Sequence, residues 1–307
     1  MRHIFIINPD AGKRNDGMDI AAHLAAHPHL DASVYVTTQP ADATNYARRV
    51  CAENDGMLRF WACGGDGTIN EVLNGVVDCQ RAEIASWPSG SGNDYVKYYG
   101  GNDVFFDFDR QLAGEAQLVD VMRVQGKYAI NVINFGFESA AAQVMQKVKH
   151  YPLIGGKNAY VLGAAWAFLT AMNSQCKVYA DNELLNPKGR LLLCSVANGQ
   201  YVGGQFRTAP RSVNDDGLMD VCAITPMPVH KAVPMMGLYQ RGGHLDSPRL
   251  KDNLIYRRAK KVTVEAGEGW MLTLDGEMLA ASHADIDVCP RAARFVVPKG
   301  AVAVGIV

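Results

Sequence analysis

The chain has 307 residues, a formal net charge of −1 and 48% hydrophobic residues. This length suits about two domains with substantial cores. A near-neutral charge lacks the basic excess that nucleic-acid binding requires, so we expect no nucleic-acid partner. Seven cysteines without a C-x-x-C pair are typical of reduced cytoplasmic thiols, not of a disulfide framework or a zinc site.

The first 117 residues alternate strand and helix patterns. We expect strands at 2–8, 33–37, 57–63 and 83–87, and helices at about 18–27, 41–54 and 68–77. This βαβα order predicts an α/β N-terminal domain, residues 1–117, with an open, mostly parallel sheet. Ligands of such sheets bind at the C-terminal ends of the strands.

From residue 118 the pattern changes to short strands separated by glycine, proline and asparagine turns. Residues 118–125 and 128–135 resemble the two arms of a hairpin. An uncharged run at 158–175 is too short and too glycine-containing for a membrane span and predicts a buried helix, with a membrane-touching surface as the alternative. We expect a C-terminal β-rich, antiparallel, sandwich-like domain at 118–293. Residues 294–307 are apolar, and we expect them to pack back on the first domain.

A glycine loop, Gly-Gly-Asp-Gly-Thr at residues 64–68, follows one predicted strand and precedes a predicted helix. Thr68 and Glu71 fit a capping box at the start of that helix. Backbone N–H groups at a helix N-terminus attract phosphate, and glycines let the phosphate come close. Asp66 is a carboxylate inside this loop, so it predicts a Mg²⁺ or lysine partner nearby. The alternative is a tight turn without a ligand.

A second loop of the same kind, Pro-Ser-Gly-Ser-Gly-Asn-Asp at residues 88–94, follows the next predicted strand. Two such loops, one strand–helix unit apart, end at the same edge of a parallel sheet. Ser91 offers a hydroxyl and Asn93 an amide to a phosphate. Together the two loops favour a nucleotide site over two flexible turns.

Two acidic turns lie in the second half of the chain. Asp275 and Glu277 flank a glycine after a predicted strand, where one of them could act as a base and the other as its partner or as a metal ligand. Residues 214–220, Asn-Asp-Asp-Gly-Leu-Met-Asp, form a turn of the kind that binds a hard cation through carboxylate and backbone oxygens. Solvated turns are the alternative for both.

Taken in order, these motifs resemble the diacylglycerol kinase catalytic-domain family, which includes bacterial soluble lipid kinases and sphingosine kinases. The resemblance spans almost the whole chain. The matching segments are Asn8-Pro9 with Gly12-Lys13, residues 64–72, residues 91–94, Asp120 with Asn131, Gly203-Gly204 with Pro210, residues 216–220 and residues 274–277. It implies an ATP- and Mg²⁺-dependent kinase whose active cleft lies between an α/β nucleotide domain and a β-rich domain.

The resemblance also implies roles for individual residues. The nucleotide-binding set would be Asn8, Lys13, Thr37, Gly64, Gly65, Asp66, Gly67, Thr68, Ile69, Asn70, Ser91, Asn93, Asp94 and Asp120. Within that set, Asp66, Asp94 and Asp120 would organise Mg²⁺ and water with Lys13. Asp216 would belong to a structural Mg²⁺ site, with backbone carbonyls from Val213 and Leu218. The proton acceptor would be Asp275 or Glu277.

We therefore hypothesise transfer of the γ-phosphoryl group of ATP to a hydroxyl of a diacylglycerol-like lipid at a membrane surface, by a cytoplasmic protein that associates peripherally. An apolar slot for such an acceptor could be walled by the helix at 160–172 and by Met235, Met236 and Leu238, for which ordinary core is the alternative. Two rival functions stay open: an NAD kinase-like phosphotransferase with a soluble acceptor, and a non-catalytic nucleotide- or lipid-binding regulator. Homodimer formation is also left open.

Overall fold

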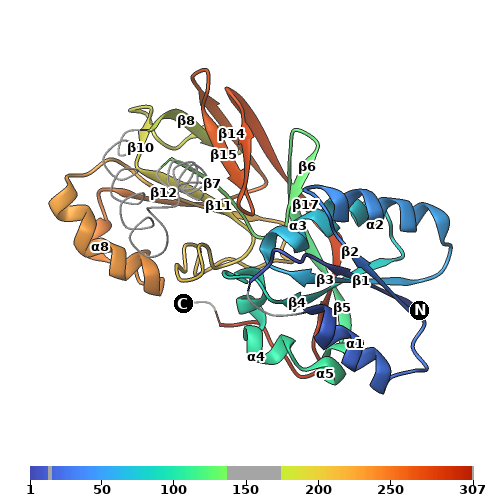
Figure 1. The fold of residues 1–307 in the computed structure, drawn as a ribbon. Helices are drawn as coiled ribbons and strands as arrows, with labels where there is room; N and C mark the ends of the chain where they lie inside the picture. Colours follow the sequence, from blue (N-terminus) through green and yellow to red (C-terminus); the bar gives the residue numbers. More distant parts are fainter. Residues whose placement is uncertain (13–15, 137–173, 306–307) are drawn as a thin grey trace, which may run out of the picture.

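A computed structural model describes residues 1–12, 16–136 and 174–305 (Figure 1). The N-terminal part has four parallel strands in the order β4-β3-β1-β2. Its elements are β1 (Arg2–Ile7), α1 (Asp16–Ala26), β2 (Ala32–Val36), α2 (Asp42–Glu53), β3 (Leu58–Gly64), α3 (Asp66–Val76), β4 (Ala82–Pro88), the 3₁₀ helix η1 (Tyr95–Tyr99), α4 (Asn102–Phe105) and α5 (Phe108–Leu112).

Helices cover both faces of this parallel sheet. In Figure 1, α2 and α3 lie on one side of it, and α1, α4 and α5 lie on the other. Every residue of β3 and β4 is buried, as expected for parallel strands packed on two faces. Phe60 and Ile84 face the α2–α3 side, whereas Trp61 and Trp87 pack with Phe108 on the other. Because these four strands pair in parallel, their C-terminal ends lie together at one edge of the sheet.

The C-terminal part is a sandwich of two antiparallel layers. Its elements are β5 (Glu115–Val124), β6 (Lys127–Ala129), β7 (Val132–Gly136), β8 (Ser174–Ala180), β9 (Glu183–Leu184), β10 (Arg190–Leu191), β11 (Leu193–Ala197), β12 (Met219–Ile224), α8 (Val229–Arg241), the 3₁₀ helix η2 (Pro248–Leu250), β13 (Leu254–Ala259), β14 (Lys261–Ala266), β15 (Met271–Leu274), β16 (Glu277–Ala280) and β17 (His283–Val297). One layer has the order β13-β12-β11-β7-β15-β16, and the other contains β8, β14 and β17. Alternate side chains of both layers share one apolar core.

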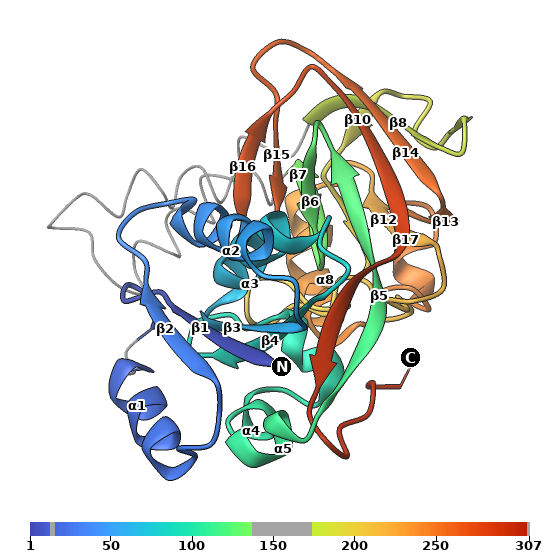
Figure 2. The same ribbon diagram turned by 90° about the vertical axis from the view of Figure 1, so that its right-hand side faces the viewer.

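The long strand β17 joins the two parts into one sheet. It pairs with β14 through its first residues and with β5 along most of its length, and Figure 2 shows β17 and β5 running side by side. Near its end, Phe295 pairs with Ile84 of β4 and packs in the N-terminal core. The expected fold class, an α/β domain followed by an antiparallel sandwich-like domain, is confirmed, and a continuous 11-stranded sheet runs through both parts.

The capping-box prediction is wrong. The N-cap of α3 is Gly65, without a side-chain cap hydrogen bond. The Glu71 carboxylate instead accepts N–H bonds from Ala41 and Ala43 at the start of α2. Because Glu71 faces the neighbouring helix, it satisfies the unpaired backbone donors of α2 rather than those of its own helix.

The predicted hairpin is only half right. Strands β5 and β6 pair around Gln125 and Gly126, both at positive φ, but the second arm stops at Ala129. Strand β7, which follows, pairs with β11 and β15 of the other layer. The chain changes layer at Ile130 and Asn131, whose N–H groups both bond to the carboxylate of Asp275.

Candidate active site

A cavity of about 980 Å³ separates the two parts of the molecule. One wall consists of the loops that follow β1, β3 and β4, at the C-terminal edge of the parallel sheet. The other wall consists of side chains from β7, β11, β12, β15 and α8, together with the loop at 202–206. The cavity thus lies where open α/β sheets bind their ligands.

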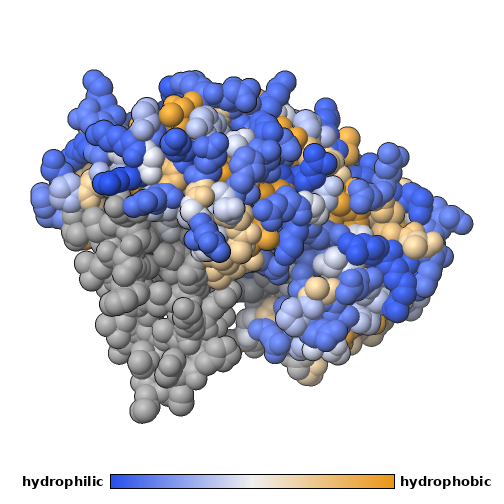
Figure 3. All heavy atoms as spheres, turned by 90° about the horizontal axis from the view of Figure 1, so that it is seen from above, coloured by the Kyte–Doolittle hydropathy of each residue, from blue (hydrophilic) through white to orange (hydrophobic). Residues whose placement is uncertain are grey.

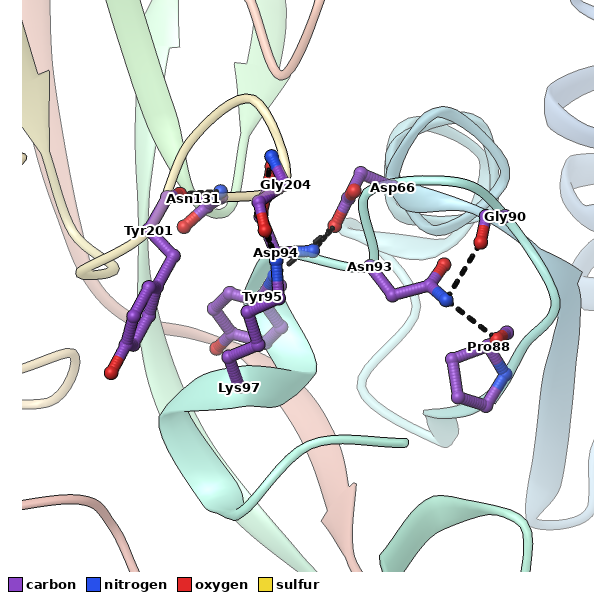
Figure 4. Close-up of polar contacts among 10 residues, drawn as sticks. All are labelled: Asp66, Pro88, Gly90, Asn93, Asp94, Tyr95, Lys97, Asn131, Tyr201 and Gly204. Carbon is purple, nitrogen blue, oxygen red and sulfur yellow. Dashed lines mark hydrogen bonds and ion pairs between the residues drawn. The ribbon is translucent and has the colours of Figure 1, made fainter. Parts of the chain in front are cut away.

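Glycines let the backbones of the N-terminal wall meet. A Cβ on Gly90 would lie 2.4 Å from the Cα of Gly65, and a Cβ on Gly12 would lie 1.8 Å from the carbonyl oxygen of Ser89. Side chains at these positions would push the loops apart. Asn93 fixes the second loop internally, because its Nδ2 donates to the carbonyls of Pro88 and Gly90 (Figure 4).

Two carboxylates converge between these loops. The Asp66 Oδ1 accepts N–H bonds from Asp94 at 2.7 Å and Tyr95 at 3.1 Å. A Cβ on Gly92 would lie 3.1 Å from Asp66 Oδ2 and 3.2 Å from Asp94 Oδ2, so both oxygens face the same small space. Burial, and then the charge of Asp94, raises the pKa of Asp66 to about 6. A divalent cation in that space would offset the repulsion between the carboxylates of Asp66 and Asp94.

A lysine clasp connects the two walls. Lys97 Nζ donates to Asp94 Oδ1 at 2.6 Å and to the carbonyl of Gly204 at 2.7 Å, while the N–H of Gly204 donates back to Asp94 at 3.0 Å. Figure 4 shows Lys97 and Asp94 of the first wall meeting Gly204 of the second. The clasp holds the 202–206 loop, which lines the cavity, against the second glycine loop.

The two acids of the late turn have different environments. Asp275 is buried at positive φ, and its carboxylate accepts four N–H bonds: Oδ2 from Asn70 and Ile130, Oδ1 from Asn131 and Val132. Burial raises the pKa of Asp275, and the four donors oppose that rise. Since a carboxylate has about four lone-pair positions, this one is saturated.

Glu277 is the accessible acid of the pair. It is the first residue of β16, is exposed, and lines the cavity. Among the described residues, its carboxylate has no hydrogen-bond or ion-pair partner. Of the two acids, only Glu277 therefore has lone pairs free to accept a proton from a bound molecule.

The far end of the cavity is apolar. Its lining includes Leu192 and Leu193, at the start of β11, and Met235, Met236 and Tyr239 of α8. Most of these residues form an apolar cluster between the sheet and the helix. Of the three α8 residues expected to wall an apolar slot, Met235 and Met236 do line the cavity and Leu238 does not. The expected helix at 160–172 lies outside the described residues.

The structure places the sequence-predicted residues in three groups. Those that line the cavity are Asn8, Gly65, Asp66, Gly67, Thr68, Ser91, Asp94, Asp275 and Glu277. Those that do not line it are Thr37, Gly64, Ile69, Asn70, Asn93, Asp120, Val213, Asp216 and Leu218. Lys13 lies outside the described residues.

Several of the residues outside the cavity have other contacts. Thr37 donates to the carbonyl of Ile7, and Ile69 is a core residue. Asn70 donates to Asp275 and to the carbonyl of Tyr128, so it ties α3 to the second part of the molecule. These residues support the site from behind rather than facing the cavity.

The other acidic turn lies away from the cavity. Asp216 forms an ion pair with Arg258, and buried Asp120 accepts N–H bonds from Gly217 and Arg291. Burial raises the pKa of Asp120, and the charges of Asp216 and Asp215 add to that rise. Among the described residues, no group of three or more His, Cys, Asp or Glu side chains is arranged to hold a metal ion. The structural Mg²⁺ site stays a prediction.

The sequence reasoning missed Lys97, Asn134 and Thr273, and it quoted Gly203-Gly204 as a matching segment without assigning the 202–206 loop a place at the cavity. Lys97 follows Asp94 by three residues, so a helical turn after the second loop was the available signal. Asn134 and Thr273 line the cavity only through tertiary packing, and their local sequence carries no such signal.

The comparisons with known proteins bear on the whole chain. A model of the diacylglycerol kinase catalytic domain matches residues 2–124, and a model of the YegS C-terminal NAD kinase beta sandwich-like domain matches residues 131–297. The chain belongs to the diacylglycerol kinase family. As a member, it is a phosphotransferase with an alcohol group as acceptor.

Individual relatives are similar over nearly their full lengths. The chain is 28% identical over 278 residues to a diacylglycerol kinase of Bacillus subtilis, which covers 89% of this chain and 88% of the relative. It is 28% identical over 301 residues to a probable YegS-like lipid kinase of Pseudomonas aeruginosa, covering 94% and 93%.

Solved structures agree on the fold. A crystal structure of a putative diacylglycerol kinase from Bacillus anthracis superimposes with a TM-score of 0.74 at 21% identity, covering 98% of both chains. Because the superposition covers 98% of both chains, the similarity in fold extends over both parts of the molecule.

Within the described residues, no helix is long and apolar enough to cross a bilayer. In the coloured part of the face in Figure 3, hydrophilic residues predominate and hydrophobic residues appear as small groups among them. Exposed Val233 and Met236 lie on α8, the helix that walls the apolar end of the cavity.

Proposed function

We propose that the protein is an ATP- and Mg²⁺-dependent lipid kinase that transfers the γ-phosphoryl group of ATP to a hydroxyl of a diacylglycerol-like lipid. One observation carries the proposal: a single cavity joins a glycine-lined, backbone-rich wall to an apolar pocket, with an accessible carboxylate between them. The first wall suits phosphates, the pocket suits acyl chains, and the carboxylate lies where the two substrates meet.

The charge of the cavity supports the need for a metal ion. Five acids line it, namely Asp10, Asp66, Asp94, Asp275 and Glu277, and no lysine, arginine or histidine does so among the described residues. A bare triphosphate would be repelled by these acids. Mg²⁺ is commonly held by one or two carboxylates together with substrate phosphates, and the Oδ2 atoms of Asp66 and Asp94 fit that donor set. When bound, the ion would neutralise phosphate charge during transfer.

Glu277 is the proposed proton acceptor. Its lone pairs are free, whereas those of Asp275 are occupied by four N–H donors. A positioned base of this kind typically contributes about 10²- to 10⁴-fold to the rate. Asp275 then has a positioning role: it holds the 130–132 segment and Asn70 together beneath the site.

The acceptor reaches the pocket from a membrane surface. The names of the relatives, diacylglycerol kinase and YegS-like lipid kinase, point to a lipid. The apolar wall formed by the β11–β12 face and α8 is the part of the cavity that accommodates it. Peripheral association through α8 is consistent with the exposure of Val233 and Met236 on that helix.

The test is transfer of labelled γ-phosphate from ATP and Mg²⁺ to a total lipid extract, with Glu277→Gln as the control protein. We expect a labelled lipid that is nearly lost in the variant. Labelling of NAD instead would support the rival phosphotransferase. Binding of ATP without transfer to any acceptor would support the non-catalytic rival.

A further inference from the structure

A row of polar side chains crosses the sheet face that lines the cavity. Thr273 of β15 is in register with Asn134 of β7, Asn134 with Ser195 of β11, and Ser195 with Cys222 of β12. The flanking residues Ile133 and Phe135 point into the sandwich core, so Asn134 points to the opposite, cavity-lining face. The row interrupts a wall that is otherwise mainly apolar.

Most members of the row have partners within the protein. The hydroxyl of Ser195 lies 3.3 Å from that of Tyr239, and Cys222 Sγ lies 3.4 Å from His244 Nε2. The Thr273 hydroxyl donates to the backbone carbonyl of Asn134 at 3.3 Å. Asn134 is different: its Oδ1 is buried and has no hydrogen-bond partner in the described part of the chain.

The position of Asn134 relates it to the reacting groups. It is 3% exposed and lines the cavity. Its register partner Thr273 is followed on β15 by Leu274, the last residue of that strand, and Leu274 is in register with Glu277 of β16. An acceptor whose reacting hydroxyl lies beside Glu277 would therefore bring its neighbouring headgroup atoms to Asn134.

We infer that the acceptor lipid carries a second hydrogen-bond donor, a hydroxyl or an amide N–H close to the reacting hydroxyl, and that Asn134 Oδ1 accepts from it. The inference rests on the proposed lipid kinase function. A buried carbonyl oxygen that stays unpaired costs free energy, and a ligand that supplies the donor removes that cost. A diacylglycerol has no donor besides its reacting hydroxyl, since its ester oxygens only accept. A monoacylglycerol has a second hydroxyl.

The experiment compares kcat/KM for 1-monoacylglycerol and for 1,2-diacylglycerol with the same acyl chain in mixed micelles. We expect the wild-type protein to prefer the monoacylglycerol by about tenfold or more, because a site built to pair a polar group discriminates strongly against a ligand that lacks it. In Asn134→Leu, which is similar in size and apolar, the ratio should fall to about one, chiefly through loss of activity on the monoacylglycerol.

Matched variants separate this role from a structural one. Ser195→Ala changes the next residue in the row, whose hydroxyl already has a partner, and should leave the ratio unchanged. If Asn134→Leu folds poorly, Asn134→Thr serves as the second test. It keeps a side-chain oxygen and should retain part of the preference for the monoacylglycerol. ATP binding, followed with a fluorescent nucleotide, should be the same in all variants.

The outcomes distinguish this inference from the proposed function. Equal activity on the two lipids in the wild type, or a preference that survives in Asn134→Leu, would overturn the role of Asn134 and leave the lipid kinase proposal standing. Labelling of neither lipid, nor of any lipid in the extract, would overturn both.

Discussion

The two walls of the cavity are built by different means. The N-terminal wall is backbone: loops at the ends of β1, β3 and β4, pressed together where Gly12, Gly65 and Gly90 leave no room for a Cβ. The C-terminal wall is side chains from a sheet face and one helix. Backbone N–H groups can hold any nucleoside triphosphate through its phosphates, whereas side chains can be exchanged to suit a different acceptor. We therefore expect acceptor specificity to depend on the C-terminal wall.

The largest expected effect lies between the walls. Glu277→Gln should lower kcat by about 10²- to 10⁴-fold, because it removes the proposed proton acceptor. Nucleotide binding, measured with a fluorescent ATP analogue, should stay within about twofold. A variant with wild-type kcat would contradict the assignment.

Asp275→Asn provides the contrast. It puts an amide among four N–H donors, so we expect a loss of about 2–4 kcal/mol in the free energy of unfolding along with lost activity. Glu277→Gln should have nearly wild-type stability in the same urea titration. Equal stability of the two variants would mean that Asp275 has no positioning role.

A change in the backbone wall should act on ATP. In Gly90→Ala the new Cβ would lie 2.4 Å from the Cα of Gly65, so the two loops must separate. We expect the KM for ATP to rise by about 30-fold or more, roughly 2 kcal/mol, with the KM for the acceptor within twofold. Gly56→Ala is the control, since no atom lies within 4 Å of its added Cβ. A rise confined to the acceptor KM would reverse our assignment of the walls.

Opening the lysine clasp should have a smaller effect. Lys97→Met removes the ammonium that bonds to Asp94 and to Gly204. We expect about a tenfold rise in the KM for ATP, and faster hydrogen exchange in the 202–206 loop. Lys127→Met, at an exposed position on β6, serves as the control. Unchanged exchange in the loop would show that the clasp does not hold it.

The smallest expected effect is a loss of folding stability at low pH, caused by a buried histidine behind the C-terminal wall. His244 is fully buried beside Cys222, and burial lowers its pKa to about 4. Between pH 6.5 and 4 the unfolded chain binds a proton there that the folded chain does not, so stability falls as the pH falls. Lowering the pH from 7.5 to 5.5 should therefore reduce the free energy of unfolding by about 1.4 kcal/mol through His244.

Urea unfolding of the wild type and His244→Leu at those two pH values measures this contribution. The pKa of buried His3 in β1 is also lowered to about 4, so part of the acid sensitivity should persist in the variant. If the variant and the wild type lose the same stability on acidification, His244 is not the source.

The sequence predicted the N-terminal wall of the cavity much better than the C-terminal wall. The strand at 57–63 and the loop after it were expected almost where β3 and the first glycine loop occur, because apolar runs and glycines are local signals. That the two glycine loops lie side by side was also predicted, because loops that follow neighbouring parallel strands lie at the same edge of the sheet. By contrast, the contact of Asp94 with Gly204 joins residues 110 positions apart, and no local pattern encodes it.

The choice between Asp275 and Glu277 shows the same limit. Both acids flank one glycine, and the sequence left the proton acceptor undecided. The structure separates them because the donors that saturate Asp275 come from Asn70 and from residues 130–132, far away in the chain. Burial and hydrogen bonding by distant segments, rather than residue type, distinguish the two carboxylates.

The most direct test of the division between the walls is a two-substrate kinetic measurement on Met235→Asp. Met235 lines the apolar end of the cavity, and a charge there should oppose binding of an acyl chain. With a short-chain monoacylglycerol or diacylglycerol in mixed micelles, we predict at least about a tenfold rise in the acceptor KM and an ATP KM within twofold of the wild type. An ATP KM that rises while the acceptor KM stays constant would contradict the account.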